Sequence, residues 1–289
     1  MTDKPSDDKA AAMFCADLVR NHDFARYAAT IFVPADVRRA LLALYAFNVE
    51  IIRIRDQVSQ PLPGEVRMQW WTDLLAGAGH GGVEGNPVAS ELLLALRSFH
   101  LPAEPLSRLI DEHQFDLYND PMPTLAALEG YAQETSSALF ALAARIMAPP
   151  SAGIEHLARH AGFALAFVQV IASLPHDAAR RQLFLPLQFL QSHGSSMEEV
   201  FAGKQTPKAR AAIDQLIDEA RRHLQTAFQL LAEISPAARP VFLPLALARG
   251  DLARMSRADN DPFAPRVASR FSILWTIWRA SRSKQFKFG

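Results

Sequence analysis

Two aspartates lie near the ends of two long apolar segments that the sequence predicts to be helical. Asp177 lies near the end of the segment His160–Pro186, and Asp56 closes the run ALYAFNVEIIRIRD. Carboxylates that share a divalent cation must lie on one helical face, which a spacing of four residues provides. The residues four positions earlier are Ser173 and Ile52. Each segment therefore carries one carboxylate where a magnesium–diphosphate site needs two.

The surroundings of these aspartates are compatible with either a structural role or a metal site. Arg53 and Arg55 lie beside Asp56, which is typical of a surface ion-pair cluster, whereas the alternative is a surviving metal ligand facing a central cavity. Glu50 lies about 240° around the helix from Asp56, so it does not supply the missing ligand. His176 adds one imidazole to the second aspartate, which leaves most metal positions to water or a remote group.

Other polar residues could also contribute to a site. Asp116 follows two acidic residues on a predicted helix and either faces a cavity or is exposed, as acidic helix residues commonly are. Arg180 and Arg181 form a basic turn, which is typical of a solvent-exposed surface but also suits a phosphate or an anionic lipid. His156 and His160 are one helical turn apart without a ligand triad, so we expect ordinary polar-face histidines rather than zinc ligands.

The C-terminal segment Arg266–Gly289 contains six Lys and Arg residues and no acidic residue. Trp275 and Trp278 share one helical face, and this spacing favours packing against the core. The alternative is a surface for an anionic membrane or an acidic partner, formed by Trp275, Trp278, Arg282, Lys284 and Lys287. The remainder of the chain has no matching basic stripe, so nucleic acid is not an expected partner.

Composition predicts a globular protein in a reducing compartment. The chain has 289 residues, a formal net charge of zero, 49% apolar and 21% charged residues. The single Cys15 excludes an internal disulfide and a multi-cysteine metal site, and is expected to be a small buried side chain. The polar, acidic N-terminus is unlike a secretory signal, and the apolar run Ala161–Leu174 is too short to span a bilayer. We expect a cytoplasmic protein that is soluble or peripheral on the inner membrane.

Apolar residues recur every three or four positions, which predicts one all-α domain of packed helices with a central cavity. Residues 1–8 are expected to be a disordered tail, residues 9–281 the helical domain and residues 282–289 a basic tail. Pro175 is expected to kink or end its helix. The predicted helices are Ala10–Asn21, Ala35–Gln57, Glu65–Ala76, Pro87–Phe99, Ala103–Leu117, Thr124–Met147, Ile154–Leu174, Leu187–Ser192, Pro207–Ile234, Ala237–Arg254 and Ala264–Ser281.

Four segments in order resemble the squalene/phytoene synthase family: LLALYAFNVEIIRIRD, IDEHQFDLY, GYAQETSSALFALAARIM and HAGFALAFVQVIASLPHDAARRQLFLP. The resemblance covers roughly residues 14–280. It implies a single isoprenoid-synthase domain with a large central cavity. Active members of the family join two prenyl diphosphates head to head, and two aspartate-rich helices hold the magnesium ions that neutralise the diphosphates.

The chain departs from the family at the metal-binding positions. The first motif of the family reads like YAFCRxxDDxxD, and here Ile52 and Arg53 replace its paired aspartates while Asp56 is kept. The second reads like QxxNxxRDxxxDxxxGRxYLP, and here Ser173 replaces its first aspartate while Asp177 is kept. The second motif also has Ala166, Gln169 and Ala172 in place of its Gln, Asn and Arg, and Arg181-Gln182 in place of its Gly-Arg. The residues Phe184-Leu185-Pro186 match the Tyr-Leu-Pro that ends the motif.

Within the family, the chain most resembles the branch associated with assembly of respiratory complex I. The similar segments are Phe47–Glu50, Asp56, Arg67–Trp71 and Arg180–Pro186. The lack of an evident targeting peptide, together with a composition rich in Ala and Arg, predicts a bacterial relative.

The resemblance and its departures imply a non-catalytic protein without a cofactor. Its cavity or basic surface is expected to bind a lipid, an isoprenoid such as a quinone tail, or a complex I subunit or assembly intermediate. The alternative is an active prenyltransferase that uses Mg²⁺, with Asp56, Asp116 and Asp177 as ligands and farnesyl or geranylgeranyl diphosphate as substrate. A third hypothesis is a lipid-binding helical protein without an assembly role. The residual diphosphate or metal-site positions are Asp56, Asp177, Asp116, Arg53, His176 and Arg181.

Overall fold

The computed structural model describes residues 4–78, 85–266 and 268–283. These residues form helices without a strand, which confirms the predicted all-α fold. The elements are α1 (Lys4–His22), α2 (Phe24–Thr30), α3 (Ala35–Gln57), α4 (Pro61–Leu75), α5 (Pro87–Ser98), α6 (Glu104–His113), η1 (Gln114–Leu117), α7 (Leu125–Ala132), η2 (Gln133–Ser137), α8 (Ala138–Met147), α9 (Ala152–Ala179), α10 (Leu187–Ser192), α11 (Met197–Phe201), α12 (Pro207–Leu230), η3 (Arg239–Phe242), α13 (Leu245–Met255) and α14 (Arg270–Arg282).

Several element bounds differ from those predicted. Helices α3 and α10 have the predicted ends, whereas the short helices α2 and α11 were not predicted. Helix α1 begins at Lys4, so residues 4–8, which we expected in a disordered tail, are helical. The predicted helix Thr124–Met147 is divided by the π-helical turn η2, and α14 begins six residues after its predicted start at Ala264. Periodicity locates apolar faces more reliably than it locates helix ends.

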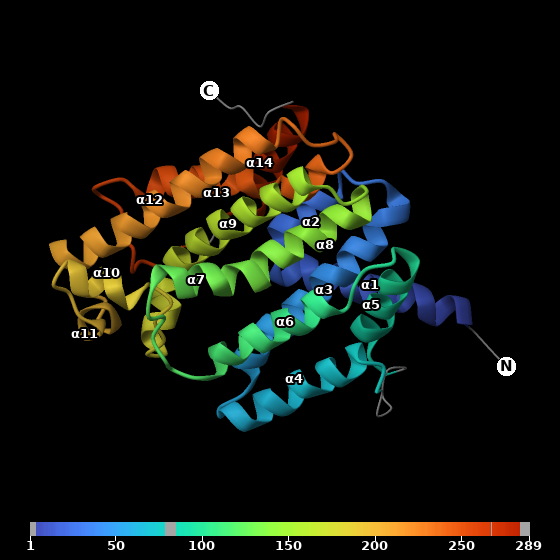
Figure 1. The fold of residues 1–289 in the computed structure, drawn as a ribbon, viewed down its shortest axis with the longest axis horizontal. Coiled ribbons are helices and arrows are strands. Elements are labelled where there is room, and N and C mark those ends of the chain that lie inside the picture. Colours follow the sequence, from blue (N-terminus) through green and yellow to red (C-terminus); the bar gives the residue numbers. More distant parts are fainter. Residues whose placement is uncertain (1–3, 79–84, 267, 284–289) are drawn as a thin grey trace.

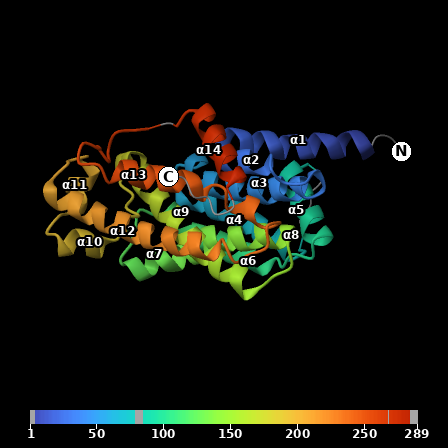
Figure 2. The same ribbon diagram turned by 90° about the horizontal axis from the view of Figure 1, so that it is seen from above.

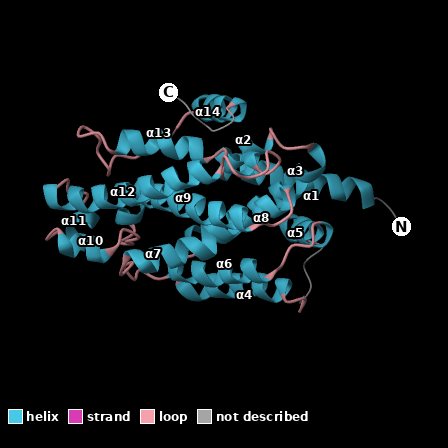
Figure 3. Ribbon diagram, turned by 45° about the horizontal axis from the view of Figure 1, so that its top comes forward, coloured by secondary structure: helices cyan, strands magenta, loops and turns pink. Residues whose placement is uncertain are grey.

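Helices α3 and α9 occupy the centre of the molecule (Figure 1). Helix α9 packs against α12, α8, η2 and α13, and α3 packs against α1, α5 and α8. The short helices α10 and α11 lie at the end of the molecule opposite the N-terminus of α1 (Figures 1 and 2). Helix α14 lies on the outside, against α2 and α13, and only loops connect the helices (Figure 3).

Helix α9 continues through Pro175 to Ala179. The expectation that the helix ends at Pro175 is therefore wrong. A proline inside a helix removes one backbone hydrogen bond and costs about 3 kcal/mol. Leu174 and Ala178, on either side of Pro175, are 2% and 6% exposed, so burial of the last turn opposes this cost. The helix is apolar and long enough to span a membrane, with a mean hydropathy of 1.5, but 67% of that apolar window is buried by the rest of the protein. It is a core helix, as expected.

A glycine in α9 permits close contact with the turn between α7 and α8. A Cβ atom added to Gly162 would lie 2.4 Å from the backbone N and Cα atoms of Ser137 in η2. The Ser137 hydroxyl donates to the Arg159 carbonyl at 3.1 Å, and the Thr135 hydroxyl donates to the Tyr131 carbonyl at 2.7 Å. The first bond connects the π-helical turn to α9, and the second satisfies a carbonyl group of α7 at the start of the turn.

We predict that Gly162→Ala lowers the free energy of unfolding by about 1–3 kcal/mol, because its methyl group overlaps backbone atoms that cannot move aside. Gly153→Ala in the same helix is the matched control, since no atom lies within 4 Å of the added Cβ. The control should leave stability unchanged or raise it by less than about 1 kcal/mol. Urea unfolding measures both variants, and equal stabilities would contradict the proposed contact.

Three histidines join α9 to α12. His160 Nδ1 lies 2.9 Å from His223 Nδ1, and His160 Nε2 lies 3.1 Å from His156 Nε2. The polar-face interpretation holds for the exposed His156, but His223 is packed edge-on against the rings of Phe163 and Phe167. Burial lowers the pKa of His223 from 6.5 to about 4, and the charges of His160 and Arg222 act in the same direction. His223 is therefore neutral in the folded protein at neutral pH.

We predict that the folded protein loses stability as the pH falls below about 6.5, where an unfolded-state histidine begins to bind a proton. His223 in the folded state takes up that proton only near its lowered pKa of about 4, so the loss develops between these two values. Its size is on the order of 3 kcal/mol. His223→Leu should flatten this part of the curve of unfolding free energy against pH, whereas His193→Gln on the surface should not. A curve that keeps its slope in His223→Leu would refute the assignment.

Candidate functional site

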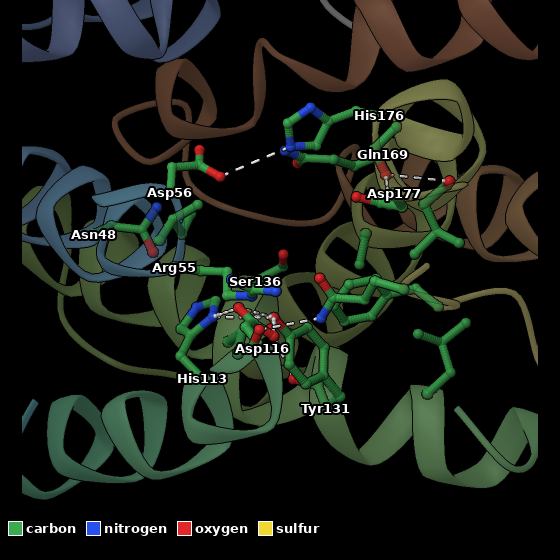
Figure 4. Close-up of a pocket in the computed structure, with 18 of the residues that line it drawn as sticks. Asn48, Arg55, Asp56, His113, Asp116, Tyr131, Ser136, Gln169, His176 and Asp177 are labelled. Atoms are coloured by element: carbon green, nitrogen blue, oxygen red, sulfur yellow. Dashed lines mark hydrogen bonds and ion pairs between the residues drawn. The ribbon is translucent and has the colours of Figure 1, made fainter. Parts of the chain in front are cut away.

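A pocket with a volume of about 260 Å³ lies between α3, α9 and the segment from α6 to η2. This volume is near the lower end of the range for small-molecule sites. Figure 4 shows the polar side chains that face it. Helix α3 contributes Asn48, Ile52, Arg55 and Asp56; α9 and its C-cap contribute Ala166, Gln169, Val170, Ser173, His176, Asp177 and Arg180; the remaining polar lining comprises Arg26, His113, Asp116, Tyr131, Thr135, Ser136 and Gln182.

An arginine connects the two central helices at one side of the pocket. Arg180, at the end of α9, donates to Asp56 at the end of α3 through Nη1, and to the Arg55 carbonyl through Nη2 at 3.4 Å. The same Nη1 atom lies 3.1 Å from Nε2 of His176. His176 Nε2 also lies 3.7 Å from Asp56 Oδ1. Asp56 is 52% exposed, so the ion pair contributes at most about 1 kcal/mol to stability.

A second polar cluster surrounds Asp116, which lies in η1 (Figure 4). Nδ1 of His113 lies 2.6 Å from Asp116 Oδ2, and the Tyr131 hydroxyl donates to Asp116 Oδ1 at 3.0 Å. Burial raises the pKa of Tyr131 well above its ordinary value, and the Asp116 charge acts in the same direction. Asp116 is 9% exposed, so of the two interpretations the buried, cavity-facing one is confirmed. Its carboxylate is already engaged by protein donors.

The third carboxylate of the pocket, that of Asp177, is bound by a serine one helical turn earlier. The Ser173 hydroxyl donates to Asp177 Oδ2 at 2.5 Å, across one helical turn. Burial raises the pKa of Asp177, and the charge of Asp116 acts in the same direction. Hydrogen bonding by Ser173 and the charges of His176 and Arg180 oppose that rise. The environment therefore favours the neutral carboxyl relative to an aspartate in water.

The turn after α9 determines which of its residues reach the pocket. Arg181 has a φ angle of +56°, and Gln182 N donates to the Asp177 carbonyl at 2.9 Å, as in a Schellman turn. The buried Gln182 side chain is thereby directed inward and donates to the Asp116 carbonyl at 3.2 Å. Arg181 instead lies over the Phe201 ring, with its guanidinium carbon 4.9 Å from the ring centre.

The structure brings together only some of the predicted site residues. Asp56, Asp116, His176 and Asp177 line the pocket, whereas Arg53 and Arg181 do not. Trp275, Trp278 and Arg282 belong to α14, away from this site, and Lys284 and Lys287 lie outside the described residues.

The sequence did not identify several residues that shape the pocket. Arg180 was expected in a basic turn that is either solvent-exposed or in contact with a phosphate or an anionic lipid, and its contact with Asp56 was not expected. With α9 continuous, Arg180 follows His176 by one turn and faces the same side. The spacing of His113 and Asp116 is a helical contact spacing, which could have identified that pair. No local signal places Tyr131, because its contact with Asp116 depends on tertiary packing.

The donors around the pocket do not fit a cluster of magnesium ions. Three aspartates line it together with Arg55 and Arg180, whose positive charges oppose the binding of divalent cations, while Arg26 is paired with Asp23 outside the lining. Asp56 is bound to Arg180, Asp116 to Tyr131 and Asp177 to Ser173. Across residues 4–78, 85–266 and 268–283, no three His, Cys, Asp or Glu side chains are grouped to hold a metal ion.

Comparison with known proteins gives the family. A model of the squalene/phytoene synthase family matches residues 19–279. The chain belongs to the squalene/phytoene synthase family. The complex I assembly factor 6 of Rattus norvegicus, an NADH dehydrogenase (ubiquinone) assembly factor by name, is 30% identical over 262 residues, covering 91% of this chain and 79% of the relative.

Relatives of this family that are named as enzymes are also similar. The phytoene synthase of Thermus thermophilus is 25% identical over 253 residues, covering 84% of this chain and 83% of that enzyme. A crystal structure of a dehydrosqualene synthase with a ligand superposes with a TM-score of 0.82 at 14% identity, covering 97% of this chain and 99% of that one. The resemblance to the squalene/phytoene synthase family and its isoprenoid-synthase fold is thus confirmed.

We predict that Asp177→Asn raises the free energy of unfolding at neutral pH, because it replaces a buried carboxylate with a neutral side chain of the same shape. In the wild-type protein, the protonated Asp177 carboxyl contributes fully to the free energy of unfolding at low pH. This contribution is lost as the pH rises through the raised pKa of Asp177. The advantage of the variant should therefore shrink on acidification. Asp111→Asn, at an exposed position of α6, is the control and should show no such dependence. A less stable Asp177→Asn protein at neutral pH would contradict the prediction.

Proposed function

We propose that this member of the squalene/phytoene synthase family is a non-catalytic assembly factor for respiratory complex I. The observation that carries the proposal is the contact of Arg180 with Asp56, because a cation of the protein bridges α3 and α9 where active relatives collect magnesium between carboxylates. The similarity to assembly factor 6 over 91% of the chain supports the role in assembly.

The altered residues oppose ionisation of a prenyl diphosphate. A departing diphosphate concentrates negative charge, which several metal ions neutralise in active family members. Here Ile52 and Ser173 stand at two of the carboxylate positions, and Arg180 compensates the charge of Asp56. Arginine can bind a phosphate, but its single charge does not replace two or three divalent cations.

The pocket is proposed to bind a lipid or isoprenoid, with no metal required. Leu128, Leu139, Val170 and Phe184 supply apolar walls beside the polar clusters. Such a mixture suits an apolar chain with a small polar head, as in a quinone. The protein would act in the cytoplasm or on the inner membrane, close to the complex I subunit or assembly intermediate that it serves.

The catalytic alternative is tested with farnesyl and geranylgeranyl diphosphate in the presence of Mg²⁺. We expect no release of pyrophosphate under conditions in which the Thermus thermophilus phytoene synthase gives product. Mg²⁺-dependent release that Asp177→Asn abolishes would instead establish an active prenyltransferase.

The assembly role is tested by deleting the gene and measuring NADH:quinone oxidoreductase activity in membranes. Deletion should lower this activity, and the wild-type gene should restore it. Genes that encode Asp56→Asn or Asp177→Asn should also restore it, because the proposed role requires no catalytic reaction from these residues. Gln169→Trp, which fills the pocket, should not restore it, whereas Gln225→Trp on the exposed face of α12 should. Full activity in the deletion strain would refute the role in complex I assembly. Full rescue by Gln169→Trp would refute the proposal that assembly requires a ligand in the pocket.

A further inference from the structure

Helix α14 has apolar side chains on two opposite faces. Ile277 and Ala280 are fully buried against the protein, and Ile273 packs beside them. On the opposite face, Phe271, Leu274, Trp275 and Trp278 are 77%, 36%, 50% and 41% exposed. The spacing of residues 271, 275 and 278 places their side chains on one stripe of the helix. The expectation that both tryptophans pack against the core is therefore wrong, because the inward face is already filled by the smaller residues.

The side chains of the exposed aromatic stripe, Phe271, Trp275 and Trp278, lie on a helix that is fixed by contacts at both of its ends. Trp275 and Trp278 stack on each other with ring centres 5.0 Å apart, and the Arg282 guanidinium lies 5.2 Å from the centre of the Trp278 ring. At the other end, Arg270 contacts the Phe24 ring at 5.0 Å and donates to Asn21 Oδ1 at 3.4 Å. These contacts attach α14 to α1 and α2 while the aromatic stripe faces solvent.

The charges that the sequence places on α14 and its flanking residues have one sign. Arg279 and Arg282 lie in the last turn of α14, and the whole segment Arg266–Gly289 contains no acidic residue. This contrasts with the chain as a whole, in which 30 basic and 30 acidic residues balance. An occupant of this face must therefore bury indole rings and carry negative charge.

A groove adjoins the stripe between α13 and α14. Arg249 of α13 and Arg279 of α14 line it together with Trp275, and its volume is about 320 Å³. Guanidinium groups suit phosphate oxygens, to which they can donate two parallel hydrogen bonds. The groove places these two cations next to an aromatic ring, which is the arrangement that a phospholipid headgroup above its acyl chains requires.

We infer that α14 is a membrane-docking helix that lies in the interface of an anionic bilayer, with Phe271, Trp275 and Trp278 inserted and Arg249, Arg279 and Arg282 at the phosphate level. Tryptophan partitions to the boundary between headgroups and acyl chains, and arginine adds attraction to anionic lipid. A bilayer fits better than an acidic protein because it supplies both requirements along the whole length of the stripe. The inference is independent of complex I assembly.

The test is flotation of the full-length protein with vesicles of phosphatidylcholine, with and without phosphatidylglycerol. The protein should bind the anionic vesicles, and added salt should weaken this binding. Trp275→Ser/Trp278→Ser should lower the partition coefficient about tenfold or more. Arg279→Gln and Arg282→Gln should each lower it about fivefold, and phosphatidylcholine alone should show no such difference.

Two matched control variants distinguish binding through this face of α14 from non-specific adsorption to vesicles. Leu62→Ser/Val66→Ser removes apolar side chains on α4 that are 67% and 64% exposed, and Arg97→Gln removes an exposed cation on α5. Both should bind vesicles as the wild type does. Melting temperatures should be the same for all variants, since the substituted side chains are exposed.

A spectroscopic measurement reports insertion directly. Brominated lipid should quench part of the tryptophan fluorescence, and Trp275→Ser/Trp278→Ser should lose that part while Trp70 and Trp71 remain. Wild-type binding by the double tryptophan variant, or absence of quenching, would overturn the inference.

Discussion

Burial of the apolar side of α9 is the constraint from which the remaining architecture follows. The helix packs against α12, α8, η2 and α13, and Gly162 lets the backbone of η2 approach it without an intervening side chain. A helix enclosed in this way must satisfy its polar groups within the protein. Ser173 does so for Asp177, and the turn after the helix directs Gln182 to the Asp116 carbonyl. Continuity through Pro175 then carries Arg180 to Asp56.

The three carboxylates of the polar pocket are consequently paired with groups of the protein. They are engaged by an arginine, a tyrosine and a serine. In a site that collects divalent cations, neighbouring carboxylates repel one another until a metal binds. Here Arg180, Tyr131 and Ser173 each contact one of the three carboxylates, which opposes that repulsion within the folded chain. The fold of the family is retained together with a pocket between its central helices.

Helix α14 differs from the core helices in where its apolar side chains lie. The core helices bury aliphatic side chains on their inner faces, whereas α14 buries Ile277 and Ala280 and also presents aromatic rings to solvent. Exposed rings clustered with cations indicate an interaction surface more strongly than single exposed leucines do. The pocket and this surface lie on different elements, so a ligand within the fold and a membrane outside it can be bound independently.

The sequence by itself determined the all-α class and the family, because apolar periodicity and local motifs are properties of neighbouring residues. It also determined the ends of α3, where a proline precedes the first turn. The tertiary structure decided that α9 passes through Pro175, that Arg180 rather than Arg181 reaches Asp56, and that the tryptophans of α14 face outward. These outcomes depend on which faces neighbouring helices cover, and helical spacing alone does not contain that information.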